Sequence, residues 1–361
     1  MVFLVINPNL LNKDLTHNGS WVFDEIPFQD NRYRWGRQMK AHQKATYIVA
    51  GFCFFLGLCT AAFAQSTAPF PDKTIQYIIP FPPAGESDLV ARYQADISAK
   101  KFGQPMVVMN RAGAGGALVW STLNTYPADG ATVVGVNIPH TILQPLQEGI
   151  QYKTDDINAI YYYHFTPDAL MVSADSPYKT YQEFIAAAKK EPGKMSLAGS
   201  AQYSANHMAV ERLNKLADVK INYVPFKGTG DLITALIGMH VDGAMGYLPL
   251  AIQQKGKVRT LAIATEKRNP ALPDVPTFKE LGLNWVDGAY RGVAVPKSTP
   301  LILQQKMSDY FAKLNADPET KKKLEDSGFI LVDIPLAKMP AFIKEKTAQS
   351  MEDAKNAGMI K

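Results

Sequence analysis

Two glycine-containing loops could bind an anion through their backbone amides. Gly85 to Asp88 follows the apolar run Ile75 to Ile79, and Gly113 to Ala117 follows the apolar run Met106 to Met109. Each loop leads directly into a helical pattern, and a helix start carries unpaired backbone N–H groups and a partial positive charge. Two such starts placed side by side would therefore suit a carboxylate.

Side chains of the first loop could add to this site or only support it. The Ser87 hydroxyl is a further donor, yet Ser87 or Asp88 could equally serve as a helix N-cap, which contributes about 0.5–2 kcal/mol to stability. Glu86 is an awkward neighbour for an anion. It could point to solvent, or it could accept a hydrogen bond from a ligand hydroxyl or amine.

The second loop resembles a phosphate cradle but fails the sequence tests for one. Leu118 stands where a dinucleotide-binding motif needs its last glycine, and the Lys-Ser/Thr of a P-loop is missing. Gly115 and Gly116 could still let a small anion approach the backbone, or they could form a tight turn that needs positive φ. Arg111 could pair with the ligand or form a structural salt bridge beneath the loop.

A third strand-to-helix turn, Gly199 to Ser204, could contribute from the second half of the chain. Ser200 offers a hydroxyl donor, and Tyr203 offers an aromatic face with a polar tip for a ring or an acyl chain. Ordinary packing is the alternative for Tyr203, and His207 could contact the ligand or could cap and pack its own helix. Asn137 ends an apolar strand and could reach the same cleft.

Other kinds of chemistry lack their usual motifs. The four histidines downstream of residue 65 show no H-E-x-x-H or similar metal spacing, and no G-x-S-x-G nucleophile elbow is present. The formal charge is +5 without a dense Lys/Arg run, which disfavours nucleic-acid binding. We therefore expect no metal, no cofactor and no catalytic residue, and the sequence singles out no acid–base pair of carboxylates.

The N-terminal region predicts export. No charged residue occurs from 45 to 64, Lys40 and Lys44 precede this stretch, and it ends in Ala62-Phe63-Ala64. A positive start, an apolar centre and an A-x-A ending are typical of a secretory signal peptide, with cleavage before Gln65. A membrane anchor is the alternative, because the uncharged run is nearly long enough to span a bilayer.

The signal peptide would comprise residues 39–64, with Met39 as the true start. Residues 1–38 would then be a non-native N-terminal extension. Both cysteines, Cys53 and Cys59, fall inside this leader, so the predicted mature protein has neither a disulfide nor a thiolate.

Strand and helix patterns alternate along the rest of the chain with short loops, which indicates parallel α/β sheets. Ligands of such sheets bind outside the carboxyl ends of the strands, where the glycine loops lie. The expected strands are Ile75 to Ile79, Met106 to Met109, Thr132 to Val136, Met195 to Ala198, Ile221 to Val224, Gly243 to Gly246, Arg259 to Ala264 and Gly292 to Val295. The expected helices are Ser87 to Lys101, Gly115 to Asn124, Tyr181 to Lys190, Ser204 to Leu216, Asp231 to Gly238, Leu301 to Leu314 and Ala337 to Ala357.

This order predicts two α/β lobes, the second inserted into the first. Lobe 1 would comprise residues 70–165 and 292–361, and lobe 2 residues 166–291. Two connecting strands, near Ile160 to His164 and Arg291 to Val295, would form the hinge. The run of three tyrosines at 161–163 fits such a strand better than a stacking platform.

An ordered series of short motifs runs through residues 70–361. The series comprises Pro80-Phe81, Gly85-Glu86-Ser87-Asp88, Ala91-Arg92, Asn110-Arg111-Ala112-Gly113-Ala114-Gly115-Gly116, Pro127-Ala128-Asp129-Gly130, His207 with Glu211, Val224-Pro225-Phe226-Lys227-Gly228, Val241-Asp242, Gly256-Lys257-Val258-Arg259-Thr260-Leu261-Ala262 and Leu272-Pro273-Asp274-Val275-Pro276-Thr277. It resembles the receptor proteins of tripartite tricarboxylate transporters, the Bug or TctC-like family of periplasmic solute-binding proteins.

The resemblance implies a bilobed α/β periplasmic-binding-protein fold, a type II-like Venus flytrap. Such a receptor would hold a small carboxylate between its lobes through backbone amides and bridging waters, and would present it to the membrane permease subunits of a tripartite tricarboxylate-type transporter. We expect a periplasmic monomer without enzymatic activity. Asp242 matches a site position of the family, although a loop aspartate that binds its own backbone is the alternative. The expected ligand-binding residues are Phe81, Gly85, Glu86, Ser87, Asp88, Gly113, Gly115, Gly116, Asn137, Gly199, Ser200, Tyr203, His207 and Asp242.

The chain departs from the family pattern at two of the expected ligand loops. The first loop is commonly richer in glycine than Pro82 to Ser87, and the second-lobe loop commonly has a further glycine within Gly199 to Ser204. The identity of the acid therefore does not carry over. Two other hypotheses stay open, an exported enzyme and a ligand-sensing module on the same scaffold.

Overall fold

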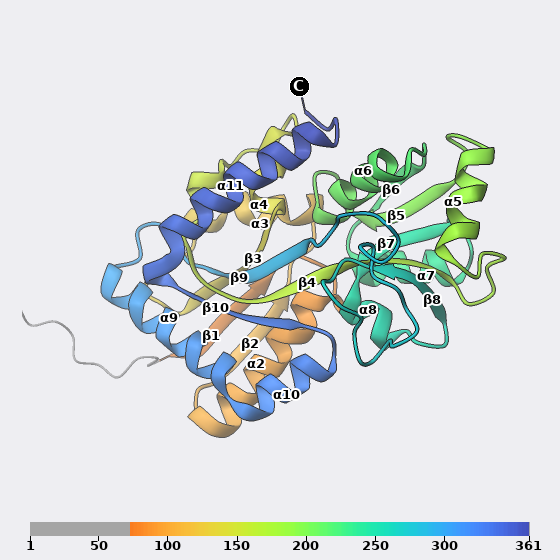
Figure 1. Ribbon diagram of the computed structural model, residues 1–361. Coiled ribbons are helices and arrows are strands. Elements are labelled where there is room, and N and C mark those ends of the chain that lie inside the picture. The colour runs from red at the N-terminus through yellow and green to blue at the C-terminus, as the bar shows by residue number, and fades with distance from the viewer. Residues whose placement is uncertain (1–72, 361) are drawn as a thin grey trace, which may run out of the picture. The chain divides into compact units, whose positions relative to one another are not determined.

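The computed structural model describes residues 73–360 of the 361-residue chain (Figure 1). The predicted extension at 1–38 and the predicted signal peptide at 39–64 lie outside the described residues. Within 73–360, no helix combines the length and the hydropathy that a membrane crossing requires.

Ten strands of the described residues form one sheet. Eight of them follow the order β2-β1-β3-β9-β4-β7-β5-β6, while β10 and β8 both pair with β4. β1 is parallel to β2 and β3, β5 is parallel to β6 and β7, and β4 is antiparallel to all its partners. The strands are β1 (Ile75–Ile79), β2 (Met106–Asn110), β3 (Thr132–Ile138), β4 (Ala159–Ser173), β5 (Ser196–Ser200), β6 (Asn222–Phe226), β7 (Gly243–Tyr247), β8 (Val258–Ile263), β9 (Gly288–Ala294) and β10 (Ile330–Pro335).

The long strand β4 belongs to two halves of the sheet. Its residues 159–167 pair with β9 and β10, and its residues 168–173 pair with β7 and β8. We call β1, β2, β3, β9 and β10 with residues 159–167 the first half, and β5 to β8 with residues 168–173 the second half. The chain returns between the halves just before β9, where Asp168 N donates to Asp287 O over 3.0 Å. The lobe boundaries expected at 165/166 and 291/292 fall inside β4 and β9 and stay predictions.

Helices cover the sheet in both halves. In the second half, Phe184 and Leu213 lie in one apolar cluster, whereas Leu232 and Leu250 lie in another. Local capping starts α5, because Thr180 and Glu183 satisfy each other's backbone N–H groups. The helices are α2 (Glu86–Phe102), α3 (Ala117–Ser121), α4 (His140–Leu143), α5 (Tyr181–Lys190), α6 (Ala205–Ala217), α7 (Thr229–Ile237), α8 (Leu248–Gln253), α9 (Leu301–Ala316), α10 (Pro318–Asp326) and α11 (Met339–Asn356).

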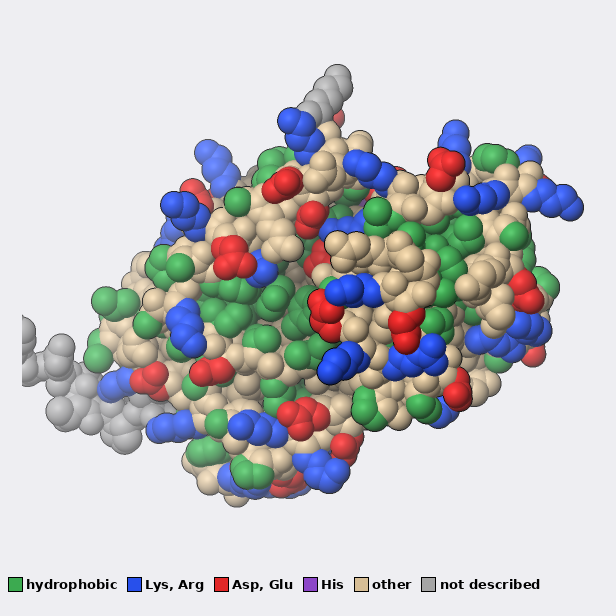
Figure 2. All heavy atoms as spheres, in the orientation of Figure 1, with side chains coloured by type: hydrophobic (Ala, Val, Ile, Leu, Met, Phe, Trp, Pro, Cys, Tyr) green, Lys and Arg blue, Asp and Glu red, His purple; other side chains and the backbone are tan. Residues whose placement is uncertain are grey.

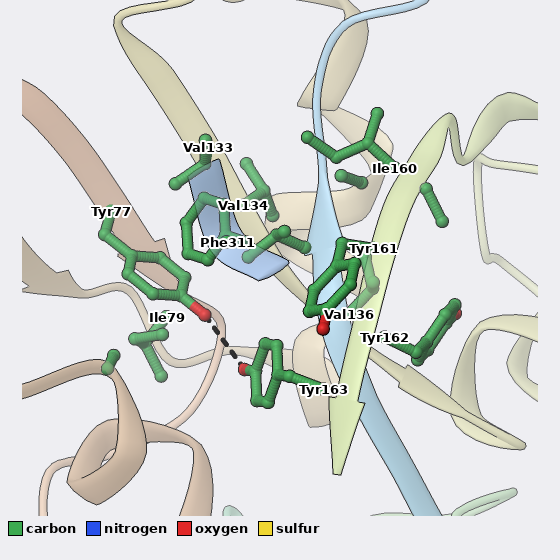
Figure 3. Close-up of a cluster of buried hydrophobic side chains, with 14 of the residues drawn as sticks. Tyr77, Ile79, Val133, Val134, Val136, Ile160, Tyr161, Tyr162, Tyr163 and Phe311 are labelled. Atoms are coloured by element: carbon green, nitrogen blue, oxygen red, sulfur yellow. Dashed lines mark hydrogen bonds between the residues drawn. The ribbon is translucent and has the colours of Figure 1, made fainter. Parts of the chain in front are cut away.

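The core of the first half is a cluster of aromatic and aliphatic side chains (Figure 3). Tyr161, Tyr162 and Tyr163 are all buried in it. The hydroxyls of Tyr163 and Tyr77 point toward each other and share a hydrogen bond of 2.9 Å, which offsets the cost of burying them. The tyrosine run is therefore part of a core strand and not a stacking platform.

Charged side chains of both signs are mixed on one face of the molecule (Figure 2). On the face shown in Figure 2, basic and acidic side chains are interspersed, and hydrophobic side chains gather in the hollow between α11 and α10. A surface of mixed sign creates weaker long-range fields than a surface of one sign.

One predicted helix is wrong. Gly115 to Asn124 is divided into a 3₁₀ turn at Ala114–Gly116, the short α3 and a second 3₁₀ turn at Leu123–Thr125. Gly115 has a φ of 61° and Gly116 a φ of 103°, and residues in this left-handed region cannot belong to a right-handed helix. The sequence patterns also did not predict α4, α8, α10 and β10, nor the continuation of β4 to Ser173.

Candidate functional site

A small cavity lies where the two halves of the sheet meet. It contains about 290 Å³ of space free of atoms, part of which is continuous with solvent. The centre of a water-sized molecule can move through only about 20 Å³ of this space, which is room for about one water. A larger ligand therefore needs the two halves to move apart. The lining residues of the cavity come from both halves and are Phe81, Pro82, Gly85, Glu86, Ser87, Asn137, His140, Ser200, Thr229, Tyr247 and Arg291.

The N-termini of α2 and α7 meet at this cavity. Gly85 precedes α2 and Gly228 precedes α7, and neither helix start has a side-chain cap. The Thr229 hydroxyl, in the first turn of α7, donates a hydrogen bond of 2.6 Å to Glu86 Oε2 in the first turn of α2. Because uncapped starts present backbone N–H groups and partial positive charge, this junction favours an anion.

Arg291 brings a full positive charge to the same place. It lies on β9 and is only 2% exposed. Its Nη2 lies 3.7 Å from Glu86 Oε2, its Nη1 donates to the Thr166 hydroxyl, and its guanidinium lies 4.6 Å from the centre of the Tyr247 ring. A separation of 3.7 Å is too long for a good hydrogen bond, so this ion pair leaves Arg291 with donor capacity to spare.

Four residues that line the cavity have a buried polar atom without a partner in the described part of the chain. The atoms are Glu86 Oε1, His140 Nδ1, the Tyr247 hydroxyl and Arg291 Nε. Leaving such an atom unpaired costs about 1–3 kcal/mol, and native proteins rarely tolerate several in one place. The cluster therefore indicates a place where a ligand or water completes the hydrogen bonding.

His140 and Tyr247 are uncharged at neutral pH. Burial, assisted by the positive charge of Arg291, lowers the pKa of His140 to about 3, so its imidazole is uncharged. Burial also raises the pKa of Tyr247 above its ordinary value, so its hydroxyl stays protonated and can donate. Glu86 and Arg291 are thus the charged side chains among the lining residues.

Six of the predicted site residues line the cavity. In the first half they are Phe81, Gly85, Glu86, Ser87 and Asn137, and in the second half Ser200. The hydroxyl and the backbone N–H of Ser200 both donate to one side-chain oxygen of Asn206, so the hydroxyl proton is already engaged.

Asp88 does not line the cavity and instead holds the first loop together. Its carboxylate accepts hydrogen bonds from the N–H of Ala84, the guanidinium of Arg92 and the side-chain amide of Asn110, at 2.9–3.0 Å. Burial opposes the charge, but the bonds from Arg92, Ala84 and Asn110 outweigh burial and lower the pKa of Asp88. The alternative role of Ser87 or Asp88 as the helix N-cap is wrong, because Gly85 is the N-cap of α2 and no side chain caps it.

The second glycine loop also lies outside the cavity lining. Gly115 packs so closely against Ala201 of the second half that a Cβ would overlap the Ala201 Cβ, and its carbonyl accepts a hydrogen bond of 2.9 Å from Gln144. Gly113 and Gly116 pack against Leu118 and Trp120 of their own segment. Because α3 is only five residues long, the expected helix dipole is absent here. Of these glycines, Gly115 allows close contact between the halves.

Arg111 does not line the cavity, and it forms no salt bridge within residues 73–360. It is exposed, its Nη1 donates to the Tyr126 hydroxyl over 3.1 Å, and its guanidinium lies 5.8 Å from the centre of that ring.

Three predicted residues of the second half pack beside the cavity rather than into it. At Gly199 a Cβ would meet the side chains of Tyr223 and Asn206. His207 stacks on Tyr223 at 4.4 Å, and its Nδ1 accepts from the backbone N–H of Tyr203. Burial lowers the pKa of His207 to about 4. Tyr203 and His207 therefore have the packing roles that were their alternatives.

Asp242 lies at the opposite end of the strands. Its carboxylate accepts from the N–H and the hydroxyl of Ser196, the first residue of β5, at 2.8 and 2.9 Å. The cavity is lined by Ser200 and Tyr247, the last residues of β5 and β7. Ligands of parallel sheets bind at the carboxyl ends of the strands. Asp242 lies at the amino ends of β5 and β7, away from the ends that line the cavity.

Five lining residues were not predicted: Pro82, His140, Thr229, Tyr247 and Arg291. Arg291 had a usable signal, because a lone arginine interrupts an otherwise apolar strand pattern, and a buried charge requires a partner. His140 and Tyr247 follow β3 and end β7, and ordinary core residues have the same sequence pattern. Within 73–360, no three His, Cys, Asp or Glu side chains gather as a group that could hold a metal ion.

Comparisons with known proteins agree with this geometry. Residues 90–358 match the family model described as the tripartite tricarboxylate transporter family receptor. The chain belongs to this family. It is also 31% identical over 260 residues to "Protein BugT" of Bordetella pertussis, which covers 70% of this chain and 80% of BugT. The predicted resemblance to Bug and TctC-like receptors is confirmed.

Two solved structures confirm the predicted fold class. The periplasmic binding protein BugD is similar with a TM-score of 0.75 and 26% identity, covering 80% of this chain and 99% of BugD. Rpa4515 of Rhodopseudomonas palustris, solved with adipate, has a TM-score of 0.76 and 25% identity, covering 80% and 99%. The chain has the bilobed α/β fold of periplasmic binding proteins, and its family consists of solute-binding receptors.

Proposed function

We propose that this protein captures a small carboxylate between the two sheet halves and releases it unchanged. The observation that carries the proposal is the cavity at the uncapped starts of α2 and α7, where Arg291 keeps an unpaired buried donor. The adipate in the similar structure of Rpa4515 is a carboxylate, which supports this choice of ligand class.

The expected affinity is micromolar. A hydrogen bond to a charged group is worth about 1.5–3 kcal/mol. Four or five such bonds, reduced by desolvation of the ligand and ordering of the halves, leave about 8 kcal/mol, which corresponds to a Kd near 1 μM.

Ligand entry requires the halves to separate. The hydrogen bond from Thr229 to Glu86 and the contact of Gly115 with Ala201 both join the two halves. We propose that the halves turn about the two crossing segments, residues 166–168 and 287–288. A hinge of this kind would admit the ligand and then exclude water from it.

We propose binding without turnover. In the described residues, the lining hydroxyls make no hydrogen bond to the His140 side chain, so a nucleophile activated by this histidine is not assembled. The Thr229 hydroxyl does donate to a carboxylate, that of Glu86, but this hydrogen bond joins the two halves. Recovery of the bound acid unchanged after long incubation, followed by mass spectrometry, tests this part; a new product would contradict it.

We also propose a periplasmic location and delivery of the ligand to the permease of a tripartite tricarboxylate-type transporter. The family description and the predicted signal peptide support this role. N-terminal sequencing of the exported protein should find Gln65 first, and crosslinking in membranes should capture the permease. A mature protein that begins within residues 1–38, or one that stays in the cytoplasm, would contradict the proposal.

The ligand class can be tested directly. Native mass spectrometry of freshly purified protein would reveal any acid that co-purifies. Calorimetry and thermal shift across mono-, di- and tricarboxylates should then show at least one micromolar binder that raises the melting temperature. The absence of both heat and shift with every acid would overturn the proposed function.

A further inference from the structure

We propose that the cavity selects a zwitterionic α-amino acid over the acid of the same skeleton that lacks the amino group. This inference rests on the proposed function and narrows its substrate class. It starts from a feature that carboxylate binding alone does not explain. An acidic side chain, Glu86, is buried in the wall where the ligand carboxylate would lie.

The charges of the empty cavity balance. Glu86 is 4% exposed and Arg291 is 2% exposed, and their charged groups lie 3.7 Å apart. His140, the other titratable base in the lining, is neutral because burial lowers its pKa to about 3. The wall therefore contributes one positive and one negative charge.

A plain carboxylate would upset this balance. Its charge would add to that of Glu86, leaving two negative charges against Arg291 and the partial positive charges of the two helix starts, in a place removed from water. An unbalanced buried charge is strongly unfavourable. A ligand with both a carboxylate and an ammonium group adds no net charge, so the cavity stays balanced when it is full.

The unpaired atoms match the same ligand. Glu86 Oε2 already accepts from Thr229, whereas Glu86 Oε1 has no donor. Arg291 Nε and the Tyr247 hydroxyl have donors without acceptors. An ammonium group supplies the missing donor to Glu86, and a carboxylate supplies acceptors to Arg291 and Tyr247. A ligand hydroxyl could also donate to Glu86 but would bring no positive charge.

Two other roles for Glu86 are possible within the same geometry, and each predicts a different result. If Glu86 only neutralises Arg291, the amino group of the ligand would make no difference. If Glu86 only holds the halves together through Thr229, loss of its charge would weaken every ligand to a similar extent.

The experiment uses matched pairs of ligands that differ by the amino group. Calorimetry with the predicted mature protein would compare alanine with propionate, aspartate with succinate, glutamate with glutarate, and phenylalanine with 3-phenylpropionate. Malate is added as the hydroxyl counterpart of aspartate. In the best-binding pair we expect the amino acid to bind at least 10-fold tighter than its partner.

Replacement of the charge should reverse this preference. Glu86→Gln keeps the size of the side chain and leaves Arg291 as the charge in the wall. The amino acid of the best pair should then lose at least 30-fold in affinity, while its deaminated partner should bind at least as tightly as before. Glu266→Gln is the matched control, because Glu266 is exposed, does not line the cavity and forms an ion pair with Lys279. It should leave both affinities within twofold.

Every other result would contradict either the inference about the zwitterion or the proposed function. Deaminated acids that bind as tightly as the amino acids, or malate that matches aspartate, would overturn the zwitterion but leave carboxylate capture standing. A uniform loss in Glu86→Gln would assign Glu86 to closure alone and overturn the inference. If none of the probes binds, both the inference and the proposed function fail. Should Glu86→Gln not fold, the matched pairs on the unaltered protein still decide the question.

Discussion

Two carboxylates at the start of α2 are two residues apart and have opposite surroundings. Asp88 accepts hydrogen bonds from three different residues, whereas Glu86 accepts one from a hydroxyl, faces a guanidinium at 3.7 Å and keeps one oxygen unpaired. Both are 4% exposed, so burial does not separate them. We infer that completed hydrogen bonding marks the carboxylate that supports the loop, and that incomplete hydrogen bonding at a cavity marks the carboxylate that binds a ligand.

Removal of Arg291 should have the largest effect on ligand binding, and it tests the difference between Glu86 and Asp88 most strongly. In Arg291→Met we expect affinity for the best ligand to fall at least 100-fold, about 2.7 kcal/mol. Stability should also fall by about 3–5 kcal/mol, because Glu86 is left buried without its counter-charge. Calorimetry and denaturant unfolding would measure the two effects.

A double variant separates the two effects of this change. Arg291→Met combined with Glu86→Gln should recover most of the stability without recovering binding, since the buried charge is gone but so is the donor. Arg291→Met that binds within threefold of the unaltered protein would show that the unpaired guanidinium nitrogen is irrelevant to the ligand.

Asp88→Ala should give the reverse pattern. Loss of the carboxylate leaves the N–H of Ala84 and the amide of Asn110 without an acceptor, so unfolding free energy should drop by about 2–3 kcal/mol. Affinity should change by less than 10-fold, because Asp88 does not line the cavity. An affinity loss as large as that of Arg291→Met would erase the difference between the two carboxylates.

Acid should remove the contribution of Asp88. Its folded-state pKa is lowered, so the stability it adds is present above the unfolded pKa of about 3.9 and is lost as pH falls through the lower folded value. The gap in unfolding free energy between the unaltered protein and Asp88→Ala should therefore be constant from pH 7 to 5 and narrow below pH 4. A gap that widens in acid would contradict this sign.

Local patterns in the sequence predicted much of the fold, whereas contacts between residues distant in sequence could not be predicted. Alternating apolar runs and glycine turns predicted most elements within a few residues, because local patterns decide them. The first loop was predicted because Gly85 stands directly between a strand and a helix. The start of α7 was not predicted as part of the site, because its contact with α2 joins residues that are 143 positions apart in the sequence.

The missed and misplaced site residues share this cause. Asp242 and Ser200 both adjoin strands of the second half, and only the finished sheet shows that they lie at opposite ends. Arg291 pairs across the sequence with Glu86, and neither residue type reveals its partner. A positive φ at Gly115 was considered for the second loop, yet its close contact with Ala201 depends on the other half of the molecule.

Gly115→Ala keeps the charges of the cavity but should hinder the contact between the two halves, so it tests closure separately from charge. The new Cβ would overlap Ala201 and lie 2.6 Å from Gln144 Nε2, so the halves should meet less closely and affinity should fall about 10-fold. Gly103→Ala is the matched control, because Gly103 has a φ of 65° against 61° at Gly115 but has open space around it. Both variants should lose about 1 kcal/mol of stability from backbone strain, and only Gly115→Ala should lose affinity. Equal affinity in both would show that this contact does not serve closure.

A third carboxylate tests whether an unpaired oxygen alone marks function. Asp168, at the crossing between the halves, is 1% exposed and has an unpaired Oδ1, but it does not line the cavity. We expect Asp168→Asn to change affinity by less than threefold. An affinity change above 10-fold would mean that incomplete hydrogen bonding reports on the hinge as well as the cavity.

The pH dependence of Asp168→Asn should have the opposite sign to that of Asp88→Ala. Burial and then the nearby charge of Asp287 raise the pKa of Asp168, so the stability linked to its protonated form is present at low pH and is lost as pH rises through the raised value. Asp168→Asn should therefore be more stable than the unaltered protein above neutral pH, by about 1 kcal/mol or 2–4 °C in Tm. The exposed Asp274→Asn serves as the control and should show no such gain. A gain confined to acid would reverse the sign and contradict the role assigned to burial.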